Sequence, residues 1–209
     1  MSMNIIYHVV VGLLLALTFG MQEFIPAIEF AQHARVLLPP VFFFSAALSV
    51  TFPVMLLLAL FTGLVWDARH LPYRTERMSA TEVSEMAGEN PVEKNINVPG
   101  LPFGYSVVLF GMIGALMQGV RPLFRRGRWE LPVVMVGVGT LAWLLAEFLL
   151  LSFLRGSFEF HPGMWTKLVT NTLLAMLVSP LLLFLLHTLA RLVHYEVRNE
   201  GPTYRFYGG

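Results

Sequence analysis

Residues 36–66 read VLLPPVFFFSAALSVTFPVMLLLALFTGLVW and contain no Asp, Glu, Lys or Arg. One helix needs about 20 apolar residues to cross a bilayer, so these 31 residues are too many for one span and few for two. Thr51-Phe52-Pro53 is the only plausible helix break in this stretch, because proline lacks a backbone donor and disfavours helix in the residue before it. The stretch predicts two short helices, about 40–50 and 53–66, with a re-entrant hairpin as the alternative.

The rest of the chain has the same apolar character. Of its 209 residues 56% are hydrophobic and 13% are charged, whereas a soluble domain carries about 25% charged residues. Further long apolar runs predict spans at residues 5–21, 103–120, 131–154 and 168–189, with Pro180 as a kink in the last one. The sequence therefore predicts an all-α membrane protein, a single domain over residues 1–209 built as a bundle of six transmembrane helices.

Two polar segments interrupt or follow these spans. Residues 67–100 carry many charged side chains without apolar periodicity, which predicts a solvated acidic loop inserted between the third and fourth spans. Residues 191–209 are predicted to form a tail on the same side of the membrane as the N-terminus, because six spans are an even number. Lys and Arg are equally numerous on the two sides, so the orientation depends on the compact basic loop after the fourth span. The positive-inside rule places that loop, and with it both termini, in the cytoplasm.

Small residues suggest where helices pack, because in lipid helices associate by close approach rather than by the hydrophobic effect. Two triplets at i, i+4 and i+8 line one face of the first and fourth spans, and shorter pairs occur elsewhere. The triplets are predicted to pack inside the bundle or to dock a partner's membrane helix. They are Gly12, Ala16 and Gly20, and Gly111, Ala115 and Gly119; the pairs are Ala59/Gly63, Ala142/Ala146 and Ala175/Ser179.

Four polar side chains fall at predicted membrane depth: Gln118, Glu147, Asn171 and His187. A charge at the bilayer centre costs on the order of 3 kcal/mol on insertion scales, so Glu147 needs a partner or a proton. We expect a polar clamp with His187 or Asn171 if the fifth and sixth helices are neighbours; a cavity, a partner contact and a proton relay are the alternatives. Trp66, Trp129 and Trp165 lie at predicted helix ends, as in an interfacial aromatic belt.

Motifs for catalysis or metal binding are missing from the sequence. There is no Cys, and the six His show no metal-binding spacing. A G-x-S-x-G elbow, a P-loop and a G-x-G-x-x-G fingerprint are also absent. The net charge of +1 does not indicate a nucleic-acid partner. The sequence thus predicts no catalytic residue, no cofactor and no metal, and a bilayer as the surroundings.

The stretches LFTGLVWD at 60–67 and LPFGYS at 101–106 resemble motifs of the MreD family of rod shape-determining proteins. LFTGLVWD at 60–67 is similar to the family's Gly-Leu-x-x-Asp at the end of its third span, matched by Gly63 and Asp67. LPFGYS at 101–106 is similar to the Pro-Leu-Gly segment that opens the fourth span, matched by Pro102 and Gly104, although Phe103 stands where Leu is usual. The run 170–180, ending in Pro180, also fits. Family members pass from the Asp to the Pro-Leu-Gly within a handful of residues, whereas some 34 intervene here.

The resemblance implies a multi-pass protein of the bacterial inner membrane, similar in fold to the substrate-binding subunits of energy-coupling-factor transporters. It implies a non-enzymatic scaffold that binds MreC, and through it MreB, RodA and the elongation penicillin-binding protein. Its role would be to organise peptidoglycan synthesis in the cell wall and maintain rod shape. One alternative is a small-molecule-binding subunit of an energy-coupling-factor type transporter, with Asn171 and Trp165 as candidate ligand contacts. The other is a membrane enzyme, for which only Glu147 and His187 could supply a paired acid and base.

Overall fold

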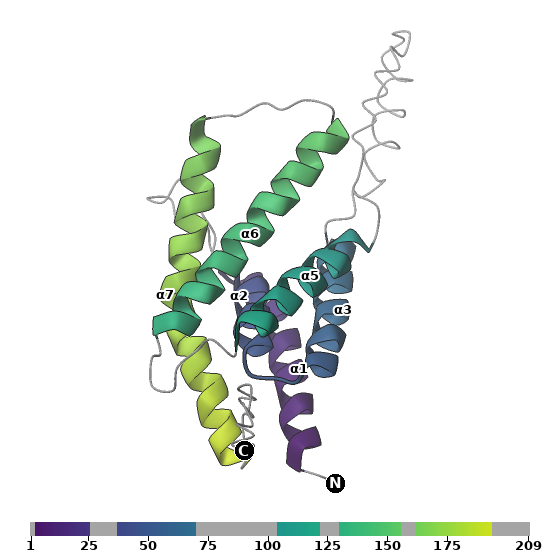
Figure 1. The fold of residues 1–209 in the computed structure, drawn as a ribbon, viewed down its shortest axis with the longest axis vertical. Coiled ribbons are helices and arrows are strands. Elements are labelled where there is room, and N and C mark those ends of the chain that lie inside the picture. Colours follow the sequence, from purple (N-terminus) through teal and green to yellow (C-terminus); the bar gives the residue numbers. More distant parts are fainter. Residues whose placement is uncertain (1–2, 26–36, 70–103, 122–129, 156–161, 194–209) are drawn as a thin grey trace, which may run out of the picture.

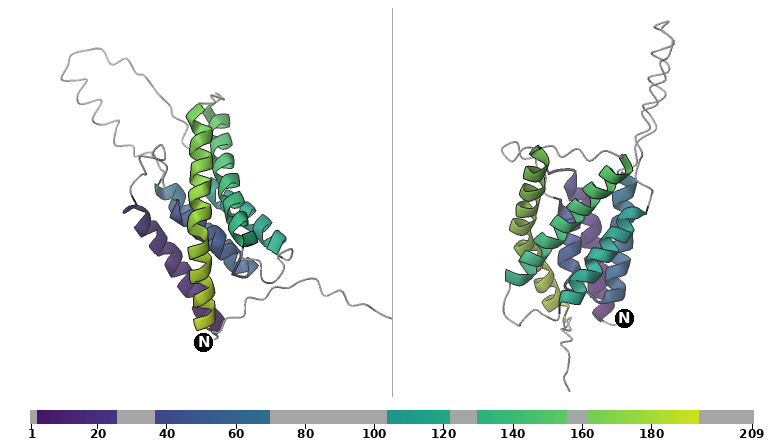
Figure 2. Two further views of the ribbon diagram at one scale, coloured as in Figure 1. Left: turned by 90° about the vertical axis from the view of Figure 1, so that its left-hand side faces the viewer. Right: turned by 45° about the horizontal axis from the view of Figure 1, so that its top comes forward.

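A computed structural model describes residues 3–25, 37–69, 104–121, 130–155 and 162–193. In this part of the chain all regular elements are helices (Figures 1 and 2), which confirms the all-α prediction. Four of them are long and apolar enough to cross a bilayer, which indicates a multi-pass membrane protein. The six helices are α1 (Met3–Gln22), α2 (Leu38–Ala47), α3 (Phe52–Arg69), α5 (Tyr105–Val120), α6 (Glu130–Arg155) and α7 (Pro162–Leu192).

Successive helices run in alternating directions, so α1 begins and α7 ends at the same end of the bundle (Figure 1). We call this the terminal end, and the other the loop end, where α1 and α3 finish and α5 starts. α5 and α6 are both tilted markedly relative to α7, and α7 changes direction along its length, with Pro180 inside it (Figure 1). The side of the membrane on which each end lies stays a prediction.

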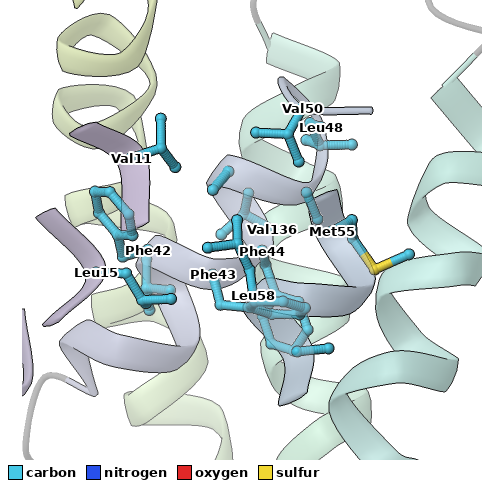
Figure 3. Packing of buried hydrophobic residues seen from close by; sticks show 14 of the residues in the cluster. Val11, Leu15, Phe42, Phe43, Phe44, Leu48, Val50, Met55, Leu58 and Val136 are labelled. Atoms are coloured by element: carbon cyan, nitrogen blue, oxygen red, sulfur yellow. The ribbon is translucent and has the colours of Figure 1, made fainter. Parts of the chain in front are cut away.

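The helix α2 is the centre of the bundle. It packs against α1, α3, α5, α6 and α7, and every residue from Pro39 to Ala47 is buried. An all-round apolar helix of this kind has no polar face to show to water, so it is stable only where other helices or lipid surround it. Figure 3 shows how its side chains divide: Phe42 faces Val11 and Leu15 of α1, while Phe43 and Phe44 point towards the other side of the core.

Both ends of α2 are completed by polar groups, as a short helix out of reach of water requires. At its start Leu38 N–H donates to Gln22 Oε1 at 2.8 Å. Pro39 and Pro40 have no N–H to satisfy, and Val41 N–H donates to Leu37 O at 3.2 Å. The double proline therefore removes two donors at the point where a helix would otherwise leave them unpaired.

At its other end α2 stops at Ala47, and the chain turns through residues 48–51 into α3. Gln118 Nε2 donates to Ala47 O at 3.0 Å and to Val50 O at 3.1 Å, and Arg121 Nη1 also donates to Val50 O at 3.1 Å. The predicted break before Pro53 is confirmed, and α2 and α3 form a helical hairpin. With 10 residues α2 is about 15 Å long, half the hydrocarbon thickness of about 30 Å, so it does not span by itself.

The outward faces of the long helices are apolar. Leu177, Phe184 and Phe153 are each more than 70% exposed, which is stable in lipid but not in water. The buried hydroxyls of Ser45 and Thr62 donate to carbonyls of their own helix, Val41 O and Leu58 O, so these two carry no unpaired donor into the core. This distribution is the one expected of a protein whose solvent is a bilayer.

Three sequence-based expectations need correction. α3 continues to Arg69, so Asp67 lies in a helix and is 5% exposed, instead of beginning a solvated loop; residues 70–100 lie outside the described residues. Trp66 is also buried, not placed in an interfacial belt, because it packs on Trp143. The last helix starts at Pro162, six residues before the predicted boundary.

Candidate functional site

The helices α3 and α5 meet in a close contact that contains both stretches of the family-like motif. A Cβ at Gly63 would collide with the backbone nitrogen of Val107 and lie 2.5 Å from its Cα. One helical turn further along α3, Asp67 Oδ2 accepts a hydrogen bond of 2.7 Å from Gly104 N–H. We call Gly63, Asp67, Gly104 and Val107 the α3–α5 corner. Its hydrogen-bonded residues, Asp67 and Gly104, are 37 positions apart in the sequence.

Asp67 acts at this corner as the acceptor for the start of α5. Gly104 is the N-cap of α5 and has φ of 100°, a left-handed backbone that favours glycine. The carboxylate of Asp67 supplies the oxygen that the N-terminal N–H of the helix needs. Its other oxygen, Oδ1, is buried with no hydrogen-bond partner among the described residues. The corner thus fixes where α5 begins relative to α3.

Replacing Asp67 tests this cap. Asp67→Leu is expected to lower the free energy of unfolding by about 2 kcal/mol, because it leaves the partly buried Gly104 N–H without its acceptor. Asp67→Asn retains a carbonyl oxygen at the same place and should lose less than half of that. Unfolding by increasing SDS in mild detergent, followed by circular dichroism, measures both. Equal losses for the two variants would contradict the role of the hydrogen bond.

An aromatic cluster lies behind the corner. The rings of Trp66 and Trp143 meet edge to face at 4.9 Å, and Trp143 stacks on Phe110 at 5.3 Å. Phe110 in turn contacts Phe43 of α2 at 5.2 Å. Because these rings come from α2, α3, α5 and α6, the corner is joined to the core on its inner side. Next to it, the hydroxyl of Tyr105 donates to Glu147 Oε1 on α6 at 3.2 Å.

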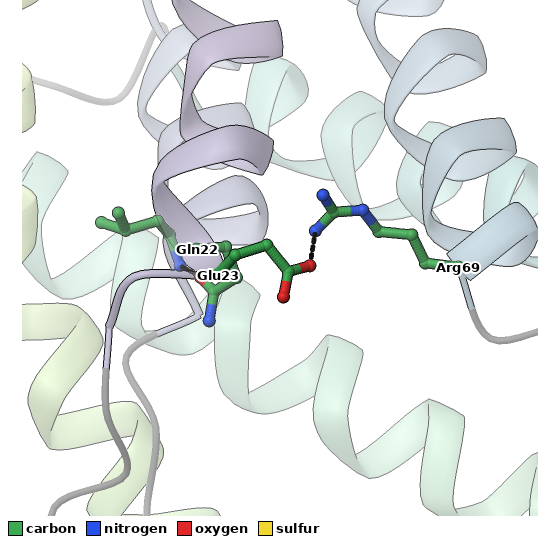
Figure 4. A network of polar contacts seen from close by, with 4 residues as sticks. Gln22, Glu23 and Arg69 are labelled. Carbon is green, nitrogen blue, oxygen red and sulfur yellow. Dashed lines mark hydrogen bonds and ion pairs between the residues drawn. The ribbon is translucent and has the colours of Figure 1, made fainter.

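The ends of α1 and α3 are tied together beside the corner, as Figure 4 shows. Arg69 Nη1 forms an ion pair of 3.0 Å with Glu23 Oε1, and its guanidinium lies 5.4 Å from the ring centre of Phe19. Glu23 is 69% exposed, so the ion pair alone contributes little stability. Gln22, at the end of α1, accepts a hydrogen bond from Leu38 N–H of α2. Together with the ion pair, this bond positions the end of α1 against both α2 and α3.

A second feature is an open cleft of about 210 Å³ between α6 and α7. Glu147, Lys167 and Asn171 are its polar lining, and the apolar lining comes from Leu144, Phe148, Leu151 and Leu168. The buried Oδ1 of Asn171 has no hydrogen-bond partner among the described residues. Glu147 and Asn171 are thus brought to one site, as expected for neighbouring fifth and sixth helices.

His187 does not belong to this site. It lies 16 residues beyond Asn171 on α7, about 24 Å along the helix, and is exposed. The predicted pairing of Glu147 with His187 is therefore wrong. Sequence reasoning missed Tyr105 and Lys167 as neighbours of Glu147. The spacing of Lys167 and Asn171 at i and i+4 could have indicated that Lys167 lies at this site, because it puts both residues on one face of a helix.

The small-residue triplets do not form the tight contacts between helices. A Cβ at Gly20, Gly111 or Gly119 would meet nothing within 4 Å, and Ala16 is exposed. At Gly12 it would lie 4.0 Å from Leu58, an ordinary contact, and Ala115 is only partly buried against the core. Packing inside the bundle is thus a wrong interpretation for most of these positions. Contact with a partner's helix stays a prediction.

The close approaches occur at other small residues. Ala59 and Gly63, Ala175 and Ser179 are buried, so two of the three shorter pairs do pack inside the bundle. A Cβ at Gly114 would lie 2.7 Å from Met55 Sδ, and one at Gly139 would lie 3.0 Å from Met117 Sδ. Gly137 faces Met176 in the same way.

The described residues contain no group of His, Asp and Glu arranged to hold a metal ion. Pro102, the remaining residue of the family-like motif besides Pro180, lies outside the described residues. No protein-family model, curated protein or solved structure matches the chain.

Proposed function

We propose that this protein is a non-enzymatic membrane scaffold of the MreD type, in the complex that elongates the bacterial cell wall. In this role it binds MreC in the inner membrane, and through MreC it is connected to MreB, RodA and the elongation penicillin-binding protein. It helps to organise peptidoglycan synthesis and maintain rod shape. In fold it would be similar to the substrate-binding subunits of energy-coupling-factor transporters.

The observation that carries this proposal is the α3–α5 corner. Gly63, Asp67 and Gly104 were singled out by their likeness to two MreD motifs, and the same three residues make the helix contact and the helix cap. A chance likeness between apolar segments gives no reason for the matched residues to meet. The small-residue faces of α1 and α5 add support, because Ala16, Gly20 and Gly119 are exposed and open to a partner's helix.

Co-purification with MreC tests the proposal. The tagged chain, extracted from its host in mild detergent, is expected to retain MreC. With a Gly111→Leu, Gly119→Leu double variant, the amount of MreC that co-purifies should fall at least about tenfold, because two bulky side chains block the close approach of helices. Ala142→Leu, an equally bulky change at an exposed position of α6, is the matched control and should retain it.

Depleting the protein should turn rods into rounded cells; unchanged rods and no MreC in the eluate would reject the scaffold.

The polar lining of the α6–α7 cleft, unlike its open shape, favours the alternative, a small-molecule-binding subunit of an energy-coupling-factor type transporter. Glu147, Lys167 and Asn171 converge there, as polar groups do in ligand sites. This alternative predicts that a water-soluble vitamin raises the melting temperature of the purified protein. The scaffold predicts no such stabilisation, so the two functions are separated by one measurement.

A further inference from the structure

We infer that the α6–α7 cleft binds a phospholipid with a zwitterionic, primary-amine head group of the phosphoethanolamine type. The inference does not depend on the scaffold role, because it rests only on the lining of the cleft and on its depth. Glu147, Lys167 and Asn171 supply the polar contacts, and Leu144, Phe148, Leu151 and Leu168 supply an apolar surface for an acyl chain.

The depth of the polar groups matches the head-group region of a bilayer. With 31 residues α7 is about 46 Å long, so when it is centred on the hydrocarbon core it exceeds the core by about 8 Å at each end. Lys167 lies five residues from the start of α7, about 7.5 Å along it, and Asn171 lies one turn deeper. Trp165, 53% exposed beside Lys167, is the kind of residue found at the membrane interface.

The polar lining is complementary to a phosphate next to an ammonium group. Lys167 is a cation, which attracts a phosphate. The carboxylate of Glu147, held from behind by Tyr105, and the buried Oδ1 of Asn171 both accept hydrogen bonds. A primary ammonium carries three donors for these acceptors, whereas a choline head group carries none. An anionic head group without an amine would be repelled by the carboxylate of Glu147.

The shape of the cleft favours a lipid over a soluble metabolite. Small-molecule sites are usually concave and bury most of their ligand. This cleft is open along α6 and α7, whose outer faces carry exposed Leu149 and Leu173. An acyl chain can therefore continue from the cleft onto the apolar surface that these two residues provide.

Native mass spectrometry of the protein after exchange into defined lipids tests the inference. In an equimolar mixture of phosphatidylethanolamine, phosphatidylcholine and phosphatidylglycerol, the wild-type protein is expected to retain phosphatidylethanolamine about tenfold over the other two. That factor is what one hydrogen bond to a charged group contributes. This comparison changes the ligand only, so it does not depend on the folding of any variant.

Variants then assign the contacts. Glu147→Gln with Asn171→Leu should abolish the preference for phosphatidylethanolamine over phosphatidylcholine. Lys167→Gln should lower retention of both lipids by a similar factor, because both carry the phosphate. Arg191→Gln is the matched control, since it removes one exposed cation at the other end of α7. Equal retention of the three lipids, a preference for phosphatidylglycerol, displacement of lipid by a vitamin, or a preference that survives the double variant would overturn the inference.

Discussion

Among the described glycines, Gly63 is expected to be the position where an added methyl group does the most damage. The new Cβ would overlap the backbone of Val107, and a backbone cannot rotate away as a side chain can. α3 and α5 would have to separate along their whole contact, which also pulls Gly104 from Asp67. We expect a loss of about 3 kcal/mol, the upper range for overpacking, and poor accumulation of folded protein in the membrane.

The matched control is Gly111→Ala on α5. It adds the same methyl group to a neighbouring turn, where nothing lies within 4 Å, and should change the stability by less than about 0.5 kcal/mol. Gly114→Ala should fall between the two, because its Cβ meets the flexible side chain of Met55. Unfolding in SDS and the yield of monodisperse protein measure all three. Equal behaviour of Gly63→Ala and Gly111→Ala would show that the α3–α5 contact is looser than described.

The same comparison explains why the sequence could not locate the helix contacts. In water, the polar face of a helix reveals which side is outside. In lipid both sides are apolar, so Gly111 and Gly114 are equivalent in the sequence although only the second is buried. The longer triplets looked like the stronger signal, yet the shorter pair Ala59/Gly63 forms the contact. Which small residues touch depends on helix rotation, and rotation is set by the neighbours.

Chain breaks were easier to predict, because they depend on backbone chemistry. Proline cannot donate, so Pro53 marked the end of the α2–α3 turn. Where a charged residue follows an apolar run, the predicted end of the helix lies within a few residues of the observed end. The burial of Asp67 was not foreseen, since a charged residue at the end of an apolar run looks solvated until its acceptor role for Gly104 is known. Likewise, Glu147 needed a partner by any electrostatic argument, but only the structure identifies Tyr105.

Gln118→Leu is expected to have the second largest effect, because it removes the group that completes α2. The side-chain amide donates to Ala47 O and Val50 O, and both acceptor residues are fully buried, so water does not replace the lost donor. Leaving Ala47 O unpaired should cost about 2 kcal/mol. Val50 O keeps the bond from Arg121, so the loss there is partial. Met112→Leu, at an exposed position of the same helix, changes no hydrogen bond and serves as the control.

Combining Gln118→Leu with Arg121→Leu tests whether the two side chains act on one acceptor. Each single variant leaves Val50 O with one donor, whereas the double variant leaves it with neither described donor. Its loss of unfolding free energy should therefore exceed the sum of the single losses by about 1 kcal/mol. SDS unfolding, followed by hydrogen exchange of the α2–α3 turn, measures this excess loss. Strictly additive losses, or a Gln118→Leu variant as stable as Met112→Leu, would mean that α2 is held by apolar packing alone.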